Sequence, residues 1–152
     1  MDNLKEDLML EARNGGICVE GYETMRSCNR EQLIDYYIQN PDWCLERNFP
    51  DLQTLATKFA DIEDKGVYIN AHFDNPILDN LQVYIFHNCK GRIRVRLNTE
   101  LKLIPMLYFA NNCDMVIECD DNISVPLYIF GKNDIIVNNT CAFKFYKHKL
   151  LK

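Results

Sequence analysis

The spacing of apolar residues changes near residue 65 of this chain. Before that point they recur every three or four positions, as Leu4, Leu8 and Ala12 do, which is typical of helices with one buried face. From Val67 onward apolar and polar residues alternate, and Val, Ile, Tyr and Phe become frequent, as in β-strands. We therefore expect a helical region over residues 1–64 and a β-repeat region over residues 65–152, joined in one compact unit.

Local signals also predict where individual helices begin and end. The glycine pair at residues 15–16 can end a first helix, because glycine adopts the left-handed conformation that closes many helices. Asn29 followed by Gln32 is a capping-box pattern at the start of another helix. The Asn-Pro-Asp sequence at residues 40–42 predicts a further start, with Asn40 as the cap and proline in the first turn.

The β region contains a degenerate internal repeat. The segment Val-Tyr-Ile-Phe-His-Asn-Cys at residues 83–89 is followed by related segments at 107–113 and 127–133, with tyrosines 24 and then 20 residues apart. Self-similarity at a period of about 20 residues is typical of a solenoid whose coils stack. We expect an α+β protein in which N-terminal helices precede a short parallel β-solenoid with two strands per coil. The alternative is an antiparallel β-meander or sandwich with a helical cap.

Asparagine recurs where the strands of this region should turn. Its side chain can hydrogen-bond the local backbone, and it tolerates left-handed turn geometry better than most residues do. Successive asparagines from 88 to 133 are 10, 14, 10 and 11 residues apart, enough for one strand and one turn each. The asparagines expected at turns are Asn88, Asn98, Asn112, Asn122, Asn133 and Asn138.

The two strands of each coil carry different patterns. The first is apolar on both faces, so one face should fill the interior, and the helices or a second copy of the chain should cover the other. The second strand alternates, so that Ile93 and Val95 should point inward and Arg92, Arg94 and Arg96 outward. The second sheet should therefore face water on one side.

This alternation predicts a basic stripe on the solvent face. Arginines at alternate positions lie about 7 Å apart, near the spacing of backbone phosphates, and could bind nucleic acid or another anionic polymer. A shift by the 24-residue repeat instead places Arg94 beside Glu118 and Arg96 beside Asp120, which would make the row part of a charge ladder. We favour the ladder. The basic stripe comprises Lys90, Arg92, Arg94, Arg96 and Lys102.

The repeat also predicts an aromatic ladder of Tyr84, Tyr108 and Tyr128, stacked in register. An exposed ladder would bind sugars or nucleobases by stacking on their faces. A ladder covered by the helices would have a structural role instead. We favour the structural role, because the strands that carry these tyrosines are apolar on both faces.

Candidate metal or catalytic residues are few. His87, Cys89 and Cys113 could offer soft ligands to a metal, but they lack the paired spacing of zinc sites, so we expect buried thiols and no cofactor. The chain contains no Gly-x-Ser-x-Gly sequence, no P-loop and no Gly-x-Gly-x-x-Gly sequence. The common enzyme classes therefore find no support.

Charge and cysteine content narrow the choice of partner and compartment. The net charge of −5 disfavours general binding to nucleic acid or to an anionic membrane surface. Seven cysteines at irregular spacing, and an acidic N-terminus where an export signal would be basic, predict a cytoplasmic protein with reduced thiols. The chain contains no run of about 18 apolar residues, so we expect no membrane span.

The segment at residues 29–38, followed by Trp-Cys-Leu-Glu at 43–46, Phe-Pro at 49–50 and the asparagine-punctuated repeats, resembles a loose group of gut-bacterial and phage-associated proteins. That resemblance implies a small helical head on a β-solenoid tail. It implies no activity and no functional residues.

These patterns favour a non-enzymatic protein-interaction or structural module as the function. The second hypothesis is a binder of an anionic polymer through the basic stripe, and the third is an enzyme of undefined type. The expected partner is another protein, and the alternative partner is a second copy of this chain.

Overall fold

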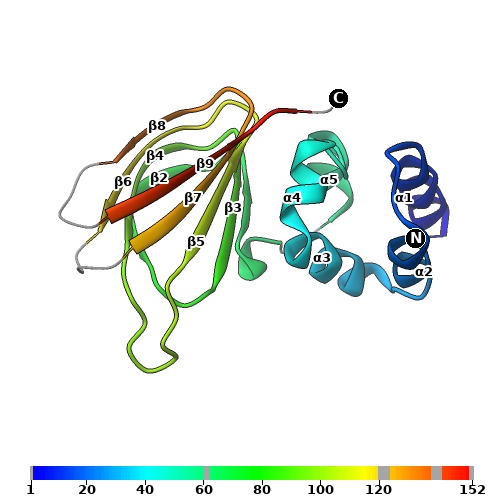
Figure 1. The fold of residues 1–152 in the computed structure, drawn as a ribbon, viewed down its shortest axis with the longest axis horizontal. Helices are drawn as coiled ribbons and strands as arrows, with labels where there is room; N and C mark the ends of the chain where they lie inside the picture. The colour runs from blue at the N-terminus through cyan, green and yellow to red at the C-terminus, as the bar shows by residue number, and fades with distance from the viewer. Residues whose placement is uncertain (1, 60–61, 120–123, 138–141, 151–152) are drawn as a thin grey trace. The chain divides into compact units, whose positions relative to one another are not determined.

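The computed structural model describes residues 2–59, 62–119, 124–137 and 142–150. The chain divides into two compact units, Met1–Ala60 with Leu150–Lys152, and Asp61–Lys149. The first contains helices and the second contains parallel strands, as the change of pattern near residue 65 predicts (Figure 1). The protein is therefore an α+β protein with a parallel β-solenoid, and the antiparallel alternative is wrong because every pair of named strands is parallel.

The described part of the helical unit contains five α-helices. Each buries the apolar residues that recur at helical spacing, among them Leu8 and Ala12 on the first helix and Leu55 on the last. The helices are α1 (Asp2–Asn14), α2 (Val19–Arg26), α3 (Arg30–Gln39), α4 (Pro41–Glu46) and α5 (Leu52–Lys58).

Two of the predicted helix boundaries are confirmed. Asn29 Oδ1 accepts from the backbone N–H of Gln32 at 2.8 Å, while Gln32 Oε1 accepts from the backbone N–H of Asn29 at 2.9 Å. These reciprocal bonds are the capping box that satisfies free N–H groups at the start of α3. Gly16, with a φ of 84°, follows the end of α1.

The boundary predicted at residues 40–42 is only partly right. Pro41 occupies the first turn of α4, where its missing N–H costs no hydrogen bond. Asn40, however, makes no side-chain cap for that helix. Its side-chain amide donates to the carbonyl of Tyr36 at 2.9 Å and so closes the preceding helix.

The solenoid alternates its strands between two parallel sheets (Figure 1). The first sheet has the order β1-β3-β5-β7-β9 and the second has the order β2-β4-β6-β8, so four complete coils precede β9. A 3₁₀-helix, η1 (Ile62–Lys65), leads into β1. The strands are β1 (Val67–Ile69), β2 (His72–Leu78), β3 (Val83–His87), β4 (Lys90–Val95), β5 (Met106–Ala110), β6 (Asp114–Cys119), β7 (Ser124–Phe130), β8 (Asp134–Val137) and β9 (Ala142–His148).

The space between the two sheets is filled by one apolar cluster. Phe86 stacks between Tyr68 and Phe109 at centroid distances of 5.6 and 5.2 Å, so neighbouring coils are joined by an aromatic column. Ile93 and Val95 point into the same cluster, as their alternation with the arginines predicts. Burying each large apolar side chain stabilises the fold by about 1.5–3 kcal/mol, which makes this interior the main source of stability for the unit.

Asparagines hold the turns between the first and second strands of several coils. Asn88 and Asn112 adopt left-handed φ angles of 51° and 65°. Asn133 Oδ1 accepts from the backbone N–H of Cys113 at 2.8 Å, which ties adjacent coils together. The prediction that asparagines mark the turns is thus confirmed at these three positions. Asn98 lies in a hairpin, and Asn122 and Asn138 lie outside the described residues.

The register between β3 and β5 differs from the predicted one by one residue. Tyr84 pairs with Leu107, and Ile85 pairs with Tyr108. The cause is the turn that follows each strand, because residues 88–89 connect β3 to β4 whereas residues 111–113 connect β5 to β6. The offset is therefore 23 residues in the first sheet (83 to 106) and 24 in the second (90 to 114). Since side chains alternate between faces, this one residue turns Tyr84 into the interior.

Candidate interaction surfaces

The basic stripe on β4 is flanked by a carboxylate on β6. Arg94 lies beside Glu118 in the register, and its Nη2 donates to Glu118 Oε2 at 2.8 Å. Arg92 donates to the other oxygen of the same carboxylate. The Glu118 side chain is 16% exposed, so these two guanidinium groups hold a largely buried acid. The predicted contact between Arg94 and Glu118 is confirmed.

Acidic residues also flank the stripe on the side of β2. Arg96 donates to Asp79, at 2.9 Å between Nη2 and Oδ2, and Asp74 lies beside Arg92 in the register. Asp120, the predicted neighbour of Arg96, lies outside the described residues. The basic stripe on β4 therefore lies between two acidic rows, which weakens the positive field that it offers to an anionic partner. Binding of such a partner stays a prediction.

The two lysines of the stripe occupy different environments. Lys90 is exposed at the start of β4 and lies beside Asp114 in the register. Lys102 is not on β4, because it lies in the turn of a hairpin between β4 and β5, with a φ of 53°. The sequence pattern therefore joined residues that belong to two separate structural elements.

The aromatic ladder on the outer face of the first sheet consists of Tyr108, Tyr128 and Tyr146. Their rings stack with centroid distances of 4.5 and 4.8 Å. The prediction that Tyr84 belongs to this ladder is wrong, because the register pairs Tyr84 with Leu107 and its side chain lies in the interior. The Tyr84 hydroxyl instead donates to Asn80 Oδ1 at 2.7 Å. Tyr108 is 5% exposed and Tyr146 is 43% exposed, so the ladder becomes accessible toward β9.

His87, Cys89 and Cys113 do not converge on one point. Cys89 and Cys113 belong to the interior cluster, where the backbone N–H of Cys89 contacts Cys113 Sγ at 3.4 Å. The neighbouring Cys113 thiol, together with burial, raises the pKa of Cys89. His87 alternates to the opposite face and accepts at Nδ1 from the Asn111 side-chain amide at 2.8 Å. Within the described residues, no group of His, Cys, Asp or Glu could hold a metal ion.

The cysteines correct one expectation from the sequence. Five of them are free thiols, but Cys119 is disulfide-bonded. The expectation of seven reduced thiols is therefore wrong. The free thiols are Cys18, Cys28, Cys44, Cys89 and Cys113.

A hairpin that the sequence pattern did not predict projects between β4 and β5 (Figure 1). Residues 96–105 form this connection, whereas residues 79–82 suffice to connect β2 to β3. Backbone bonds of 3.0 and 3.1 Å join Asn98 and Leu103 in both directions, and Asn98 Oδ1 accepts from the Leu101 N–H at 2.9 Å. The 14-residue interval between Asn98 and Asn112, the longest in the series, was the sequence signal for this insertion. We call residues 96–105 the inserted hairpin.

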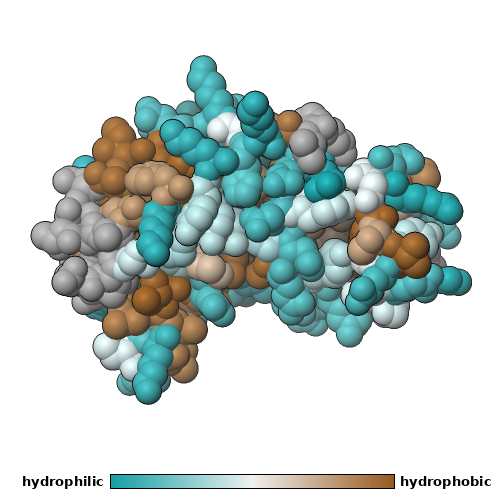
Figure 2. All heavy atoms as spheres, in the orientation of Figure 1, coloured by the Kyte–Doolittle hydropathy of each residue, from teal (hydrophilic) through white to brown (hydrophobic). Residues whose placement is uncertain are grey.

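The inserted hairpin exposes apolar side chains at and beside its turn. Leu101 is 60% exposed and Ile104 is 39% exposed, while Pro105 at its base is buried. Figure 2 shows hydrophobic residues gathered where this hairpin protrudes in Figure 1. Clusters of exposed apolar groups are common at protein interfaces, and insertions in solenoid repeats are common binding elements.

Comparison of the chain with protein-family models, curated proteins and solved structures returned no match. In the described part of the chain, no helix is long and apolar enough to cross a membrane.

Proposed function

We propose that this protein is a non-enzymatic protein-interaction module that presents the inserted hairpin to a partner protein. The observation that carries the proposal is the exposure of Leu101 and Ile104 on a hairpin with fixed geometry. Reciprocal backbone bonds and the Asn98 side chain hold this turn before any partner arrives, so binding would lose little conformational entropy there.

The stacked coils suit a presenting role. Each strand is held by parallel pairing to its neighbour, and β4 and β5 fix both ends of the inserted hairpin. A rigid base lets two apolar side chains meet a partner in one orientation. The alternative, binding of an anionic polymer by the basic stripe, receives less support because Glu118, Asp79 and Asp74 flank that row.

Site-specific photo-crosslinking in the cells that make the protein tests this proposal. A photoreactive amino acid replaces Leu101 in one variant and Ile104 in another. The control is the same replacement at Val19, an 81% exposed apolar residue on α2. We expect the two hairpin positions to give the same discrete protein adduct and Val19 to give none. Adducts at Val19 alone, or none at either hairpin position, would contradict the proposal.

A second variant separates binding from folding. Leu101→Ser combined with Ile104→Ser should leave the melting temperature nearly unchanged, because both side chains are already largely in water. The same double variant should lose the partner identified by crosslinking. Retention of that partner at wild-type affinity would show that the hairpin is not the contact.

A further inference from the structure

The last described coil of the solenoid consists of a strand of the first sheet alone. β9 extends the first sheet beyond β7, but among the described strands the second sheet ends at β8 and supplies none opposite β9. Side chains on the inner face of β9 therefore border an open pocket rather than a filled interior. Phe145, on that face, is 45% exposed.

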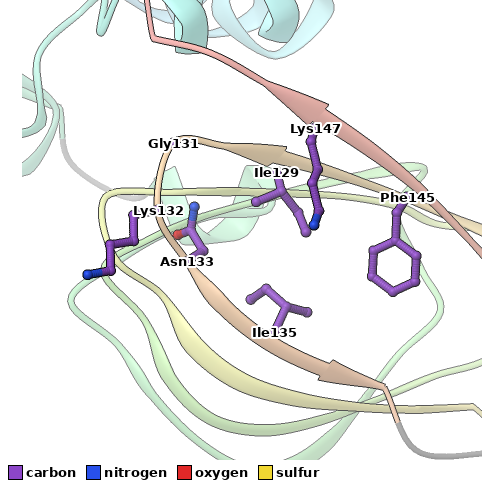
Figure 3. Close-up of a pocket in the computed structure, with 7 residues that line it drawn as sticks. All are labelled: Ile129, Gly131, Lys132, Asn133, Ile135, Phe145 and Lys147. Carbon is purple, nitrogen blue, oxygen red and sulfur yellow. The ribbon is translucent and has the colours of Figure 1, made fainter.

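This pocket has a volume of about 460 Å³ and combines apolar walls with two lysines. Figure 3 shows Lys147 and Phe145 extending from β9 toward Ile135 on β8, with Ile129 beside them. Lys132 and Asn133 in the turn between β7 and β8 complete the lining with Gly131. Among the described residues the lining contains no carboxylate, although the whole chain carries a net charge of −5.

The backbone of β9 offers hydrogen bonds on its outer side. The backbone N–H of Gly131 donates to the carbonyl of His148 at 3.1 Å, so His148 and the residues in phase with it bond to β7. In a parallel ladder alternate residues bond to opposite neighbours, so the N–H and C=O groups of Phe143, Phe145 and Lys147 face the side of β9 on which no described strand lies, here called the free edge. An unpaired strand edge of this kind can accept an added strand.

The charges at this edge indicate what such a strand would carry. Lys144 and Lys147 lie on β9 and Lys132 lies in the adjacent turn, and none of the three is paired with a carboxylate of the described residues. Pairing of β9 with β9 of a second copy would bring the lysines of both copies to one edge, which like-charge repulsion opposes. An acidic partner would instead neutralise them.

We infer that the free edge of β9 binds an extended acidic peptide segment of another protein, which pairs in parallel with β9 and places one carboxylate at Lys147. The parallel direction continues the stacking of the existing coils. In register, an apolar side chain of the peptide lies beside Phe145 and a carboxylate two residues later lies beside Lys147. The recognised pattern is thus apolar, any residue, acidic, in that chain direction. This surface is separate from the inserted hairpin.

Fluorescence anisotropy with a labelled peptide tests this inference on the full chain. The probe is Thr-Val-Thr-Val-Thr-Glu-Thr with blocked ends, and its reversed sequence serves as the direction control. We expect the forward peptide to bind more tightly than the reversed one. Lys147→Glu should weaken the forward peptide about fivefold or more, and a peptide with Lys in place of Glu should restore binding to that variant.

Lys144→Glu is the matched control, because it makes the same change in net charge on the other face of the same strand. It should change the affinity about twofold at most at physiological salt, where distant charges are screened. Equal losses in the two variants, no charge-swap rescue, or tighter binding of the reversed peptide would overturn the inference. So would concentration-dependent self-association in sedimentation that competes with the peptide. The double variant Leu101→Ser, Ile104→Ser should still bind the peptide, which separates this test from that of the proposed function.

Discussion

The two ends of the solenoid are built differently. At the N-terminal end, Phe73 on β2 is 9% exposed and packs edge-on against Tyr68 and Phe86, at centroid distances of 5.1 and 5.5 Å. Aromatic residues from both sheets thus close the interior there, and η1 contributes the buried Ile62 before β1. At the C-terminal end, Phe145 on β9 of the first sheet has no strand of the described second sheet opposite it.

This difference shows that a repeat does not fix how a stack ends. Each coil buries its apolar side chains against the next coil, so an end coil needs other residues to replace the missing neighbour. The N-terminal end has such residues within the described chain, while the C-terminal end exposes Phe145, Tyr146 and Ile136. We call the two ends the closed end and the open end, and four experiments test the contrast.

The largest expected effect is at Gly91, where β4 passes close to β2 at the closed end. Its φ is 115°, and a Cβ there would lie 2.1 Å from the carbonyl oxygen of Phe73. Gly91→Ala should therefore lower the free energy of unfolding by about 3 kcal/mol or more, from backbone strain and a clash with backbone atoms. Urea denaturation measures this.

The control for Gly91 is Gly16, which has a φ of 84° but open space where a Cβ would stand. Gly16→Ala should cost about 1 kcal/mol from backbone strain alone. Equal losses at the two glycines would mean that the close approach of β2 and β4 does not limit stability.

The next effect compares the two terminal phenylalanines directly. Phe73→Ala should lower the free energy of unfolding by about 3 kcal/mol, because it removes a buried ring and leaves a cavity. Phe145→Ala should cost about 1 kcal/mol or less, because that ring is already 45% exposed. Chemical denaturation of both variants in parallel gives the comparison. A larger loss at Phe145 than at Phe73 would reverse the assignment of closed and open ends.

A pH-dependent effect is expected at His87, on the strand next to the closed end. Burial lowers the pKa of His87 to about 4, from an ordinary value near 6.5. Between these values the unfolded chain binds a proton that the folded chain does not, so stability falls as the pH falls from about 6.5 to 4, by up to about 3 kcal/mol. Protonation of Nδ1 would also break the bond from Asn111.

The measurement is the free energy of unfolding of the wild type and of His87→Gln across this range. We expect the difference between the two curves to shift in favour of the variant as the pH falls. His148→Gln, on β9 at the open end, is the control, and its free energy of unfolding should fall with pH as that of the wild type does, because His87 is intact. Parallel curves for the wild type and His87→Gln would refute the prediction.

The smallest effect concerns charge. Arg94→Gln and Arg96→Gln should each cost at most about 1 kcal/mol, because their ion pairs with Glu118 and Asp79 involve partly exposed guanidinium groups. Lys144→Gln and Lys147→Gln at the open end should cost almost nothing, since they remove no ion pair with a described residue. Melting temperatures at low and high salt compare the two arginine variants with the two lysine variants. A greater salt dependence of the melting temperature in the lysine variants would contradict the contrast.

Much of the architecture follows from local patterns in the sequence. The change from helical to alternating spacing places the boundary between helices and strands, because each period presents one apolar face in only one type of element. The asparagines mark turns because Asn88 and Asn112 must adopt left-handed geometry there. The contact between Arg94 and Glu118 follows from the 24-residue offset, which holds in the second sheet.

Only the tertiary structure decided the features that depend on loop length and on the ends of the stack. One extra turn residue at 111–113 shifts the first sheet by one position, which moves Tyr84 inside and leaves Tyr146 to continue the ladder. The tertiary structure also decided the inserted hairpin. The sequence contains the length of this connection, but it does not show that the connection projects from the solenoid. Local spacing fixes which face a residue takes within its own strand, whereas pairing between strands depends on every connection that lies between them.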